Sequence, residues 1–250
     1  LIGDGLKVIF YPSLTYNVDE KKSANHYNCP VVAYYAELLN SNMEDLKKVD
    51  FIYPYLDVTS PMALAKTFSK TLKTLDSSIT DREIKQAAKN GFKAYNDYKT
   101  ALYAEGKKAV EYARAHKKRI MVLAGRPYHI DPEIGHGIDK LANTLGFAVV
   151  SEDSICNDIP RQNVNVLDQW TFHSRLYRAA AYASQNSDVE LVQLVSFGCG
   201  VDAITTDEVR AILEGNHKHY TQLKIDEITN LGAVKIRLRS LIGALEECEK

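Results

Sequence analysis

The stretch IMVLAGRPYHIDPEIGHGIDKLANTLGFAVV, residues 120–150, contains a complete strand-helix-strand pattern. Its two short apolar runs, IMVLA at 120–124 and FAVV at 147–150, flank a segment around 134–145 with helical spacing. Short apolar runs rich in β-branched residues indicate strands that are buried on both faces. A helix between two such strands is typical of a parallel sheet, so this stretch predicts an α/β fold.

The same alternation continues to the end of the chain. Two further strand-like runs, ELVQLV at 190–195 and YTQLKI at 220–225, alternate with helical segments around 166–184, 206–214 and 233–247. A parallel sheet with helices on both faces needs right-handed crossovers between its strands. We therefore predict a Rossmann-like lobe of repeated βα units over residues 117–250.

The first part of the chain shows fewer of these units. Only two runs indicate strands, LKVIFY at 6–11 and VDFIYPY at 49–55. Helices are predicted from Pro30, over 61–75, and from the Thr80 capping box to His116. Residues 1–116 are therefore predicted to form a second, incomplete Rossmann-like lobe with long helices.

Composition and charge exclude several classes of protein. The 250 residues carry a net charge of −1, with 45% apolar and 25% charged residues, which is ordinary globular usage and excludes disorder as the main state. Near-neutral charge argues against a nucleic-acid partner. No run is long enough for a membrane span, and no signal peptide is present, so we expect a cytoplasmic protein without a membrane partner. The chain begins Leu1-Ile2-Gly3-Asp4 without methionine, so we expect a fragment or a processed chain.

The cysteines are too few for a disulfide framework, but their positions are informative. In an open parallel sheet, ligands bind on the loops that follow the carboxyl ends of the strands. Cys29, Cys156 and Cys199 all fall on such predicted loops, whereas Cys248 lies on the last helix and is expected to be a packing thiol. Cysteines on converging loops suit iron–sulfur ligation better than zinc, because no CxxC pair is present.

Other polar residues share this predicted edge. The candidates for roles beside a metal or facing a substrate are His26, Arg126, His129, Glu152 and Cys156. Each also has a plainer interpretation. Cys156 is more consistent with a small buried core residue, and the histidines near Asp131 are equally consistent with a closed turn.

Several segments together resemble a known family. They are GRPYHIDPE at 125–133, SEDS at 151–154, DQW at 168–170, SFGCG at 196–200, LKIDE at 223–227 and HYNCP at 26–30. With these motifs the chain resembles, from end to end, the DUF2229 region of acyl-CoA dehydratase activase-related proteins, also called CoA-substrate-specific enzyme activases. That family is in turn similar to the D-component of 2-hydroxyacyl-CoA dehydratases.

The resemblance implies a function and a cofactor. It implies two Rossmann-like lobes with a cysteine-bound [4Fe–4S] cluster between them, for which Cys29 and Cys199 stand at ligand positions. Ser13 stands where family members commonly have a cysteine. We therefore expect a cluster in the full-length protein that this chain alone does not complete. Activase-type ATPase domains in the same chain are the implied partners, with an acyl-CoA or small molecule as substrate.

Three functions are consistent with these features. The leading one is a domain linked to iron–sulfur, ATP-driven, low-potential electron transfer. The second is a cluster-free module that binds acyl-CoA or nucleotide phosphates through Arg126, the glycines beside Cys199 and helix N-termini. The third is a catalytically silent interaction lobe, as Ser13 suggests. The isolated fragment is expected to be inactive, and no catalytic residue is assigned.

Overall fold

The computed structural model describes residues 1–196, 198–225 and 230–248, and the chain divides into two compact units. The first unit contains Leu1–Lys99 and Gln169–Thr171, and the second contains Thr100–Asp168 and Phe172–Lys250. Helix α3 (Asp81–Ala115) supplies its first part to one unit and its last part to the other. The predicted boundary at residue 117 lies just after the end of this helix.

The second unit is built on a four-stranded parallel sheet. Its strands are β3 (Ile120–Ala124), β4 (Ala148–Ser151), β5 (Val189–Val195) and β6 (Thr221–Lys224). All neighbours are parallel, in the order β4-β3-β5-β6. Every residue of β3 and β5 is buried, because helices cover both faces of the sheet. The predicted α/β class and all four predicted strands are thus confirmed.

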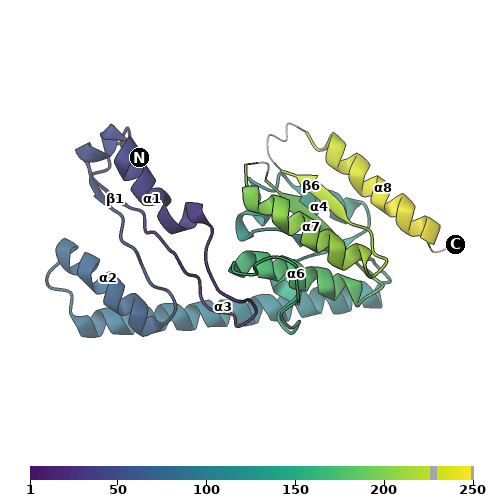
Figure 1. Cartoon of the computed structure of the whole chain (residues 1–250), viewed down its shortest axis with the longest axis horizontal. Helices are drawn as coiled ribbons and strands as arrows, with labels where there is room; N and C mark the ends of the chain where they lie inside the picture. Colours follow the sequence, from purple (N-terminus) through teal and green to yellow (C-terminus); the bar gives the residue numbers. More distant parts are fainter. Residues whose placement is uncertain (197, 226–229, 249–250) are drawn as a thin grey trace. The chain divides into compact units, whose positions relative to one another are not determined.

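Helices divide between the two faces of this sheet (Figure 1). The last part of α3 packs on one face with α6 (Thr171–Ser184) and α7 (Gly200–Glu214), around a core that includes Val122 and Leu191. The opposite face carries α4 (Ile138–Thr144) and α8 (Gly232–Cys248), around Leu123 and Leu194. The period-2 alternation of strand side chains sends neighbouring residues to opposite cores.

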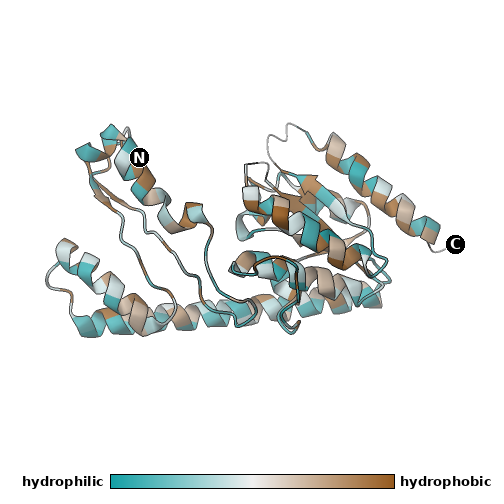
Figure 2. Cartoon of the chain, in the orientation of Figure 1, coloured by the Kyte–Doolittle hydropathy of each residue, from teal (hydrophilic) through white to brown (hydrophobic). Residues whose placement is uncertain are grey.

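Helix α3 is mostly hydrophilic along its length (Figure 2). It packs closely at Gly106, where a Cβ atom would lie 2.1 Å from the carbonyl oxygen of Ser154 in the short helix α5 (Glu152–Ile155). Only glycine allows two backbones to approach this closely. This contact holds α5, and with it Glu152, at the carboxyl edge of the sheet.

The first unit has a smaller sheet. Strands β1 (Val8–Phe10) and β2 (Asp50–Ile52) form a two-stranded parallel sheet, extended by a bridge between Ser13 and Tyr55. The helices of this unit are α1 (Pro30–Asn42), the 3-10 turn η1 (Glu44–Lys48), α2 (Pro61–Leu75) and the first part of α3. Two strands are fewer than a covered parallel sheet needs, which fits the predicted incomplete lobe.

Two helices begin at other residues than the sequence pattern predicts: α6 begins later, and α7 begins earlier. Helix α6 begins at Thr171 and not near 166, because the preceding segment is extended: the Tyr27 amide donates to the Gln169 carbonyl at 2.9 Å. Helix α7 begins at Gly200 and not near 206. Its early turns contain Thr205 and Thr206, whose hydroxyls bond back to carbonyls of the preceding turn, so poor helix formers are accommodated.

Some residues of two sequence motifs lie outside the part of the chain that the structure describes. Phe197 of the SFGCG segment, and Asp226 and Glu227 after β6, lie outside the described residues. Among the helices of the described residues, none combines the length and the apolar character required to cross a bilayer.

Candidate functional site

The strand order of the second unit defines where a site is expected. From β3 the chain passes to β4 on one side, and then to β5 on the other side of β3. At such a reversal, the two loops that follow the strands diverge to opposite faces and leave a crevice at the carboxyl edge. The loop after β3 contains Arg126 and His129, and the loop after β5 contains Ser196 and Cys199.

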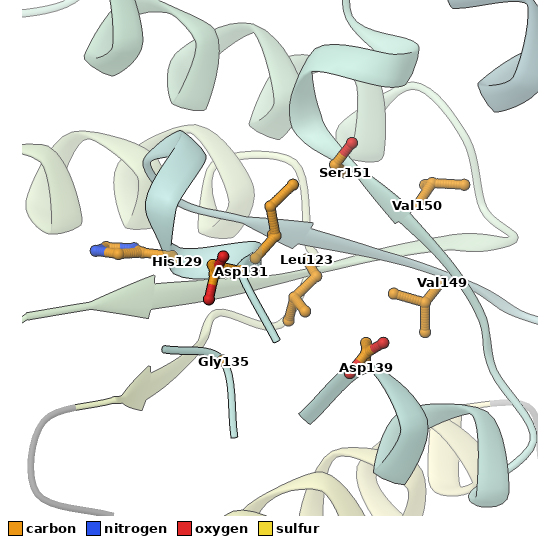
Figure 3. Close-up of a pocket in the computed structure, with 9 residues that line it drawn as sticks. Leu123, His129, Asp131, Gly135, Asp139, Val149, Val150 and Ser151 are labelled. Atoms are coloured by element: carbon orange, nitrogen blue, oxygen red, sulfur yellow. The ribbon is translucent and has the colours of Figure 1, made fainter. Parts of the chain in front are cut away.

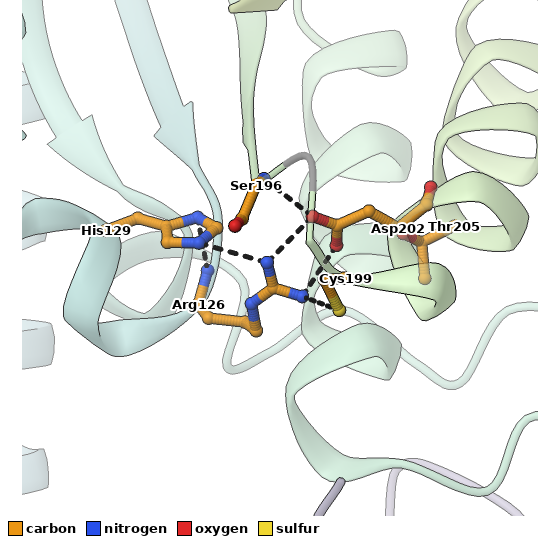
Figure 4. A network of polar contacts seen from close by, with 6 residues as sticks. All are labelled: Arg126, His129, Ser196, Cys199, Asp202 and Thr205. Carbon is orange, nitrogen blue, oxygen red and sulfur yellow. Dashed lines mark hydrogen bonds and ion pairs between the residues drawn. The ribbon is translucent and has the colours of Figure 1, made fainter. Parts of the chain in front are cut away.

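A buried ion pair joins these two loops (Figure 4). The guanidinium of Arg126 donates two hydrogen bonds of 2.7 Å to the two carboxylate oxygens of Asp202, in the first turn of α7. Both side chains are more than nine-tenths buried. The Ser196 backbone amide donates to the same carboxylate at 2.9 Å. Bidentate geometry and a third donor compensate most of the cost of burying this pair, although Arg126 Nε has no hydrogen-bond partner among the described residues.

The thiol of Cys199 lies against this pair. Its Sγ accepts a hydrogen bond from Arg126 Nη1 at 2.7 Å. Cys199 is also the N-cap residue of the 15-residue helix α7, with extended backbone and no side-chain capping bond. The sulfur therefore lies beside a guanidinium and at the start of a helix.

His129 closes the other side of the guanidinium. Its Nε2 lies 3.1 Å from Arg126 Nη2, and its Nδ1 lies 3.3 Å from the Arg126 backbone nitrogen. Both neighbours are donors, and an imidazole ring can accept a hydrogen bond from only one of them. Gly125 permits this arrangement, because a Cβ atom there would lie 2.6 Å from His129 Nδ1. The short turn η2 (Pro127–Ile130) holds the ring in place.

The electrostatics of the network follow from burial. Burial opposes the charge of Arg126, but the Asp202 carboxylate outweighs it and holds the pKa of Arg126 above its ordinary value. Burial, together with the charge of Arg126, lowers the pKa of His173 on α6 to about 4. The network therefore keeps one fixed positive charge beside the Cys199 sulfur and a neutral imidazole nearby.

Glu152 is a second buried ionisable group at this edge. It begins α5, is 2% exposed, and accepts from the backbone of Gly125. Burial, reinforced by neighbouring Asp153, raises its pKa to about 8. At neutral pH Glu152 is therefore mostly protonated, and it is hydrogen-bonded to Gly125, the residue before Arg126.

Cys156 lies in a different environment from Cys199. It is 2% exposed and belongs to the core beneath α6, with Ile155 and Leu176. Its carbonyl accepts from Arg178 at 3.2 Å. This position agrees with the core interpretation of Cys156, and the role beside a metal stays a prediction. All four cysteines are described, and none forms a disulfide.

The remaining predicted residues belong to the first unit. Ser13 is 1% exposed, and its Oγ has no hydrogen-bond partner among the described residues. Cys29 is the half-buried N-cap residue of α1, with Pro30 in the first helical position and no side-chain capping bond. His26 Nδ1 lies 2.7 Å from the Asn17 carbonyl, and its ring packs on Tyr16. Both Cys29 and Cys199 thus precede a helix of at least 13 residues.

A small pocket opens beside the network, between the ends of β3 and β4 (Figure 3). It encloses about 170 Å³ and shares His129 with the network. Its lining consists of Leu123, His129, Ile130, Asp131, Gly135, Asp139, Val149, Val150 and Ser151. Asp131 and Asp139 make its polar side acidic, so this pocket offers no charge that attracts a phosphate.

The donors of this chain fit part of a cluster site. A [4Fe–4S] cluster is usually held by four thiolates. Within the described residues, no group of three or more His, Cys, Asp or Glu side chains is placed to hold a metal ion. Cys199 and Cys29 are free thiols, each placed just before a helix, but two thiols are half of the set.

Sequence reasoning missed two members of the network, Asp202 and His173. A signal for Asp202 was present, because an acidic residue three positions after an N-cap residue is typical of a first helical turn. The predicted later start of this helix hid it. Nothing in the sequence pairs either residue with Arg126, because the contacts join separate βα units.

The fold and the site define a class: an α/β protein with Rossmann-like parallel sheets and a cysteine at the strand-order reversal. The family model described as "CoA enzyme activase uncharacterised domain (DUF2229)" matches residues 1–155, which is more than half of the chain. The chain therefore belongs to this family and is related to CoA enzyme activases. The match includes Cys29 and Arg126 and ends before Cys199. None of the curated proteins compared with the chain matches it.

Proposed function

We propose that this chain supplies thiolate ligands to a [4Fe–4S] cluster that carries low-potential electrons, driven by ATP hydrolysis in activase-type domains of the full-length protein. The observation that supports this most is the position of Cys199. It lies at the strand-order reversal, and its sulfur accepts a hydrogen bond from the buried guanidinium of Arg126. When bound, such a cluster would supply one-electron chemistry. Cys29 is the second proposed ligand, and the others would come from outside this chain.

The protein's own groups would adjust such a cluster. An N–H donor to a ligating sulfur withdraws charge from it and raises the reduction potential, so it would limit how low the potential of a bound cluster falls. Arg126 is such a donor, and Asp202 prevents it from turning away. The buried side chains of His129 and His173 would limit the access of water to one side of the half-buried Cys199.

Binding of acyl-CoA phosphates by Arg126 has less support. The guanidinium is already neutralised by a bidentate carboxylate and is buried, so it offers little to a phosphate in solvent. The adjacent pocket is acidic. An acyl-CoA substrate, if this protein has one, would need cations from another part of the full-length protein.

Anaerobic reconstitution of the full-length protein tests the proposal. We expect bound iron and sulfide with the visible absorption of a cluster, and a loss of most of both in Cys199→Ala and in Cys29→Ala. Cys248→Ala is the matched control, because it removes an exposed thiol from α8. Iron and sulfide contents that stay unchanged in Cys199→Ala would exclude this residue as a ligand and remove the main support for the proposal.

A further inference from the structure

The helical hairpin of the first unit carries an open groove. Helix α2 and the start of α3 are joined by a five-residue loop, which makes them antiparallel neighbours. Their interface is small, with Ala65, Ile84 and Ala88 as its buried apolar residues. Beside this interface lies a groove of about 510 Å³, three times the volume of the pocket at the sheet edge. All of its lining comes from these two helices: Met62, Ala63, Ala65, Lys66, Ser69, Asp81, Ile84 and Lys85.

The floor of the groove is apolar, and several of the side chains that line it are small. Ala65 and Ile84 form the buried floor, and Met62, 53% exposed, stands at the edge. Ala63 and Ser69 leave space above the floor. A row of small residues between two helices is a groove into which the ridge of another helix fits. Its concave form also distinguishes it from the convex apolar face that a membrane-surface helix presents.

The rim of the groove is positively charged. Lys66 and Lys85 line it and form no ion pair with a described residue. The one carboxylate of the groove, Asp81, is already bound by Lys73 at 2.6 Å and by the Ser69 hydroxyl at 3.0 Å, and these contacts lower its pKa. Lys85 also interacts with the charge of Asp81, although the two form no ion pair. The groove therefore presents two ammonium groups, of Lys66 and Lys85, beside an apolar floor.

The surrounding hairpin has the same sign of charge. Residues 61–97 contain seven lysine or arginine residues and four aspartate or glutamate residues, a net charge of +3 in a chain whose total is −1. A local positive excess of this size attracts an acidic partner and orients it during encounter.

We propose that the α2–α3 groove binds an amphipathic helix whose apolar ridge is flanked by acidic residues. The apolar side chains of the partner would cover Ala65, Ile84 and Met62, and its carboxylates would pair with Lys66 and Lys85. Helix-in-groove binding of this kind uses anchors spaced at i, i+3, i+4 and i+7. This surface is separate from the Cys199 network and does not depend on the proposed iron–sulfur function.

The test uses a labelled synthetic peptide of about 15 residues, with leucines at the anchor positions and glutamates beside them. Fluorescence anisotropy is measured on the whole chain without added metal. We expect saturable binding that weakens as salt is raised. The double variant K66E/K85E should weaken binding roughly tenfold. The matched control K70E/K89E changes the same charges on the same helices outside the groove, and it should have a much smaller effect.

Three results would overturn the proposal. The first is no binding of the peptide to the unmodified chain. The second is equal binding of a peptide with lysines in place of the glutamates. The third is equal weakening by K66E/K85E and K70E/K89E, which would show nonspecific attraction to the hairpin. Phosphatidylserine vesicles are tested in parallel, and binding to them without binding to the peptide would assign the basic hairpin to a membrane surface. Circular dichroism confirms that each variant keeps its helices.

Discussion

The two units of this protein use the same architecture with different degrees of completion. In the second unit, β3 and β5 are buried along their whole length between two helical layers. In the first, β1 and β2 are partly exposed, and Val8 and Phe10 are 50% and 45% accessible. Parallel pairing alone does not make a core. A strand becomes buried only when it has neighbours on both sides and helices on both faces.

The buried polar groups of the two units differ in number and in charge. The second unit buries charged side chains, and Arg126 and Asp202 pair with each other there. The first unit buries the neutral hydroxyl of Ser13, which has no hydrogen-bond partner among the described residues. The predictions below test how much these buried groups contribute to stability.

The largest expected effect comes from breaking the buried ion pair. Asp202→Ala leaves the Arg126 guanidinium buried without its counter-charge, which should lower the free energy of unfolding by about 3–5 kcal/mol. Urea denaturation followed by tryptophan fluorescence and circular dichroism measures it. Arg210→Ala is the control, because its ion pair with Asp207 is exposed and is worth little. Equal losses in the two variants would mean that the buried pair contributes no more than a surface pair.

A cavity in the core beneath α6 of the second unit should lower the free energy of unfolding somewhat less. Leu191→Ala, in the middle of β5, is expected to lower stability by about 2–5 kcal/mol, because Leu191 is 1% exposed and packs in the core beneath α6. Val8→Ala in β1 should change stability by less than about 0.5 kcal/mol. Both are measured by urea denaturation. A loss in Val8→Ala as large as that in Leu191→Ala would show that the first unit has a better core than its exposure indicates.

Glu152 should make the stability of the second unit depend on pH. Its pKa in the folded protein is about 8, above the ordinary value of 4.5, so between these values the folded state holds a proton that the unfolded state has lost. Stability is therefore expected to fall as pH rises through this range, by up to about 1.4 kcal/mol per pH unit. Glu152→Gln should remove this part of the slope. A slope that is the same in both proteins would show that Glu152 does not hold the proton.

The smallest effect is expected at Ser13. Its hydroxyl is buried without a partner, so Ser13→Ala removes a desolvated group and should change stability by less than about 1 kcal/mol, in the stabilising direction. Thermal unfolding measures it. Ser13→Cys tests the family resemblance at the same position, and we expect it to increase the iron bound by the reconstituted full-length protein. A clear loss of stability in Ser13→Ala would show that the hydroxyl has a bonding role.

Most elements of the second unit were predictable from the sequence because its strands are buried on both faces. Such strands must be apolar throughout, and runs such as IMVLA stand out from their surroundings. Helix starts were less predictable. The first turns of α7 contain glycine, aspartate and threonines, which are poor helix formers. They are helical because Asp202 is held by Arg126 and the threonine hydroxyls bond within the turn.

The candidate site was predictable in position but not in detail. The rule that ligands bind at the carboxyl edge of a parallel sheet placed Arg126, His129 and Cys199 at one edge. It treated Cys156 in the same way, although this thiol packs in the core. A loop can send a side chain outward or inward, and only the packing around it selects between the two.

The sequence by itself therefore determined the class of fold, the strands and the edge of the sheet where polar residues gather. These depend on local periodicity and on which segments are apolar. Tertiary structure decided which residues meet there. The pairing of Arg126 with Asp202, 76 positions later, and the contact of Arg126 with Cys199 exist because β5 joins the sheet on the far side of β3 from β4. The strand order is set by the burial of whole helices and strands, which no single segment encodes.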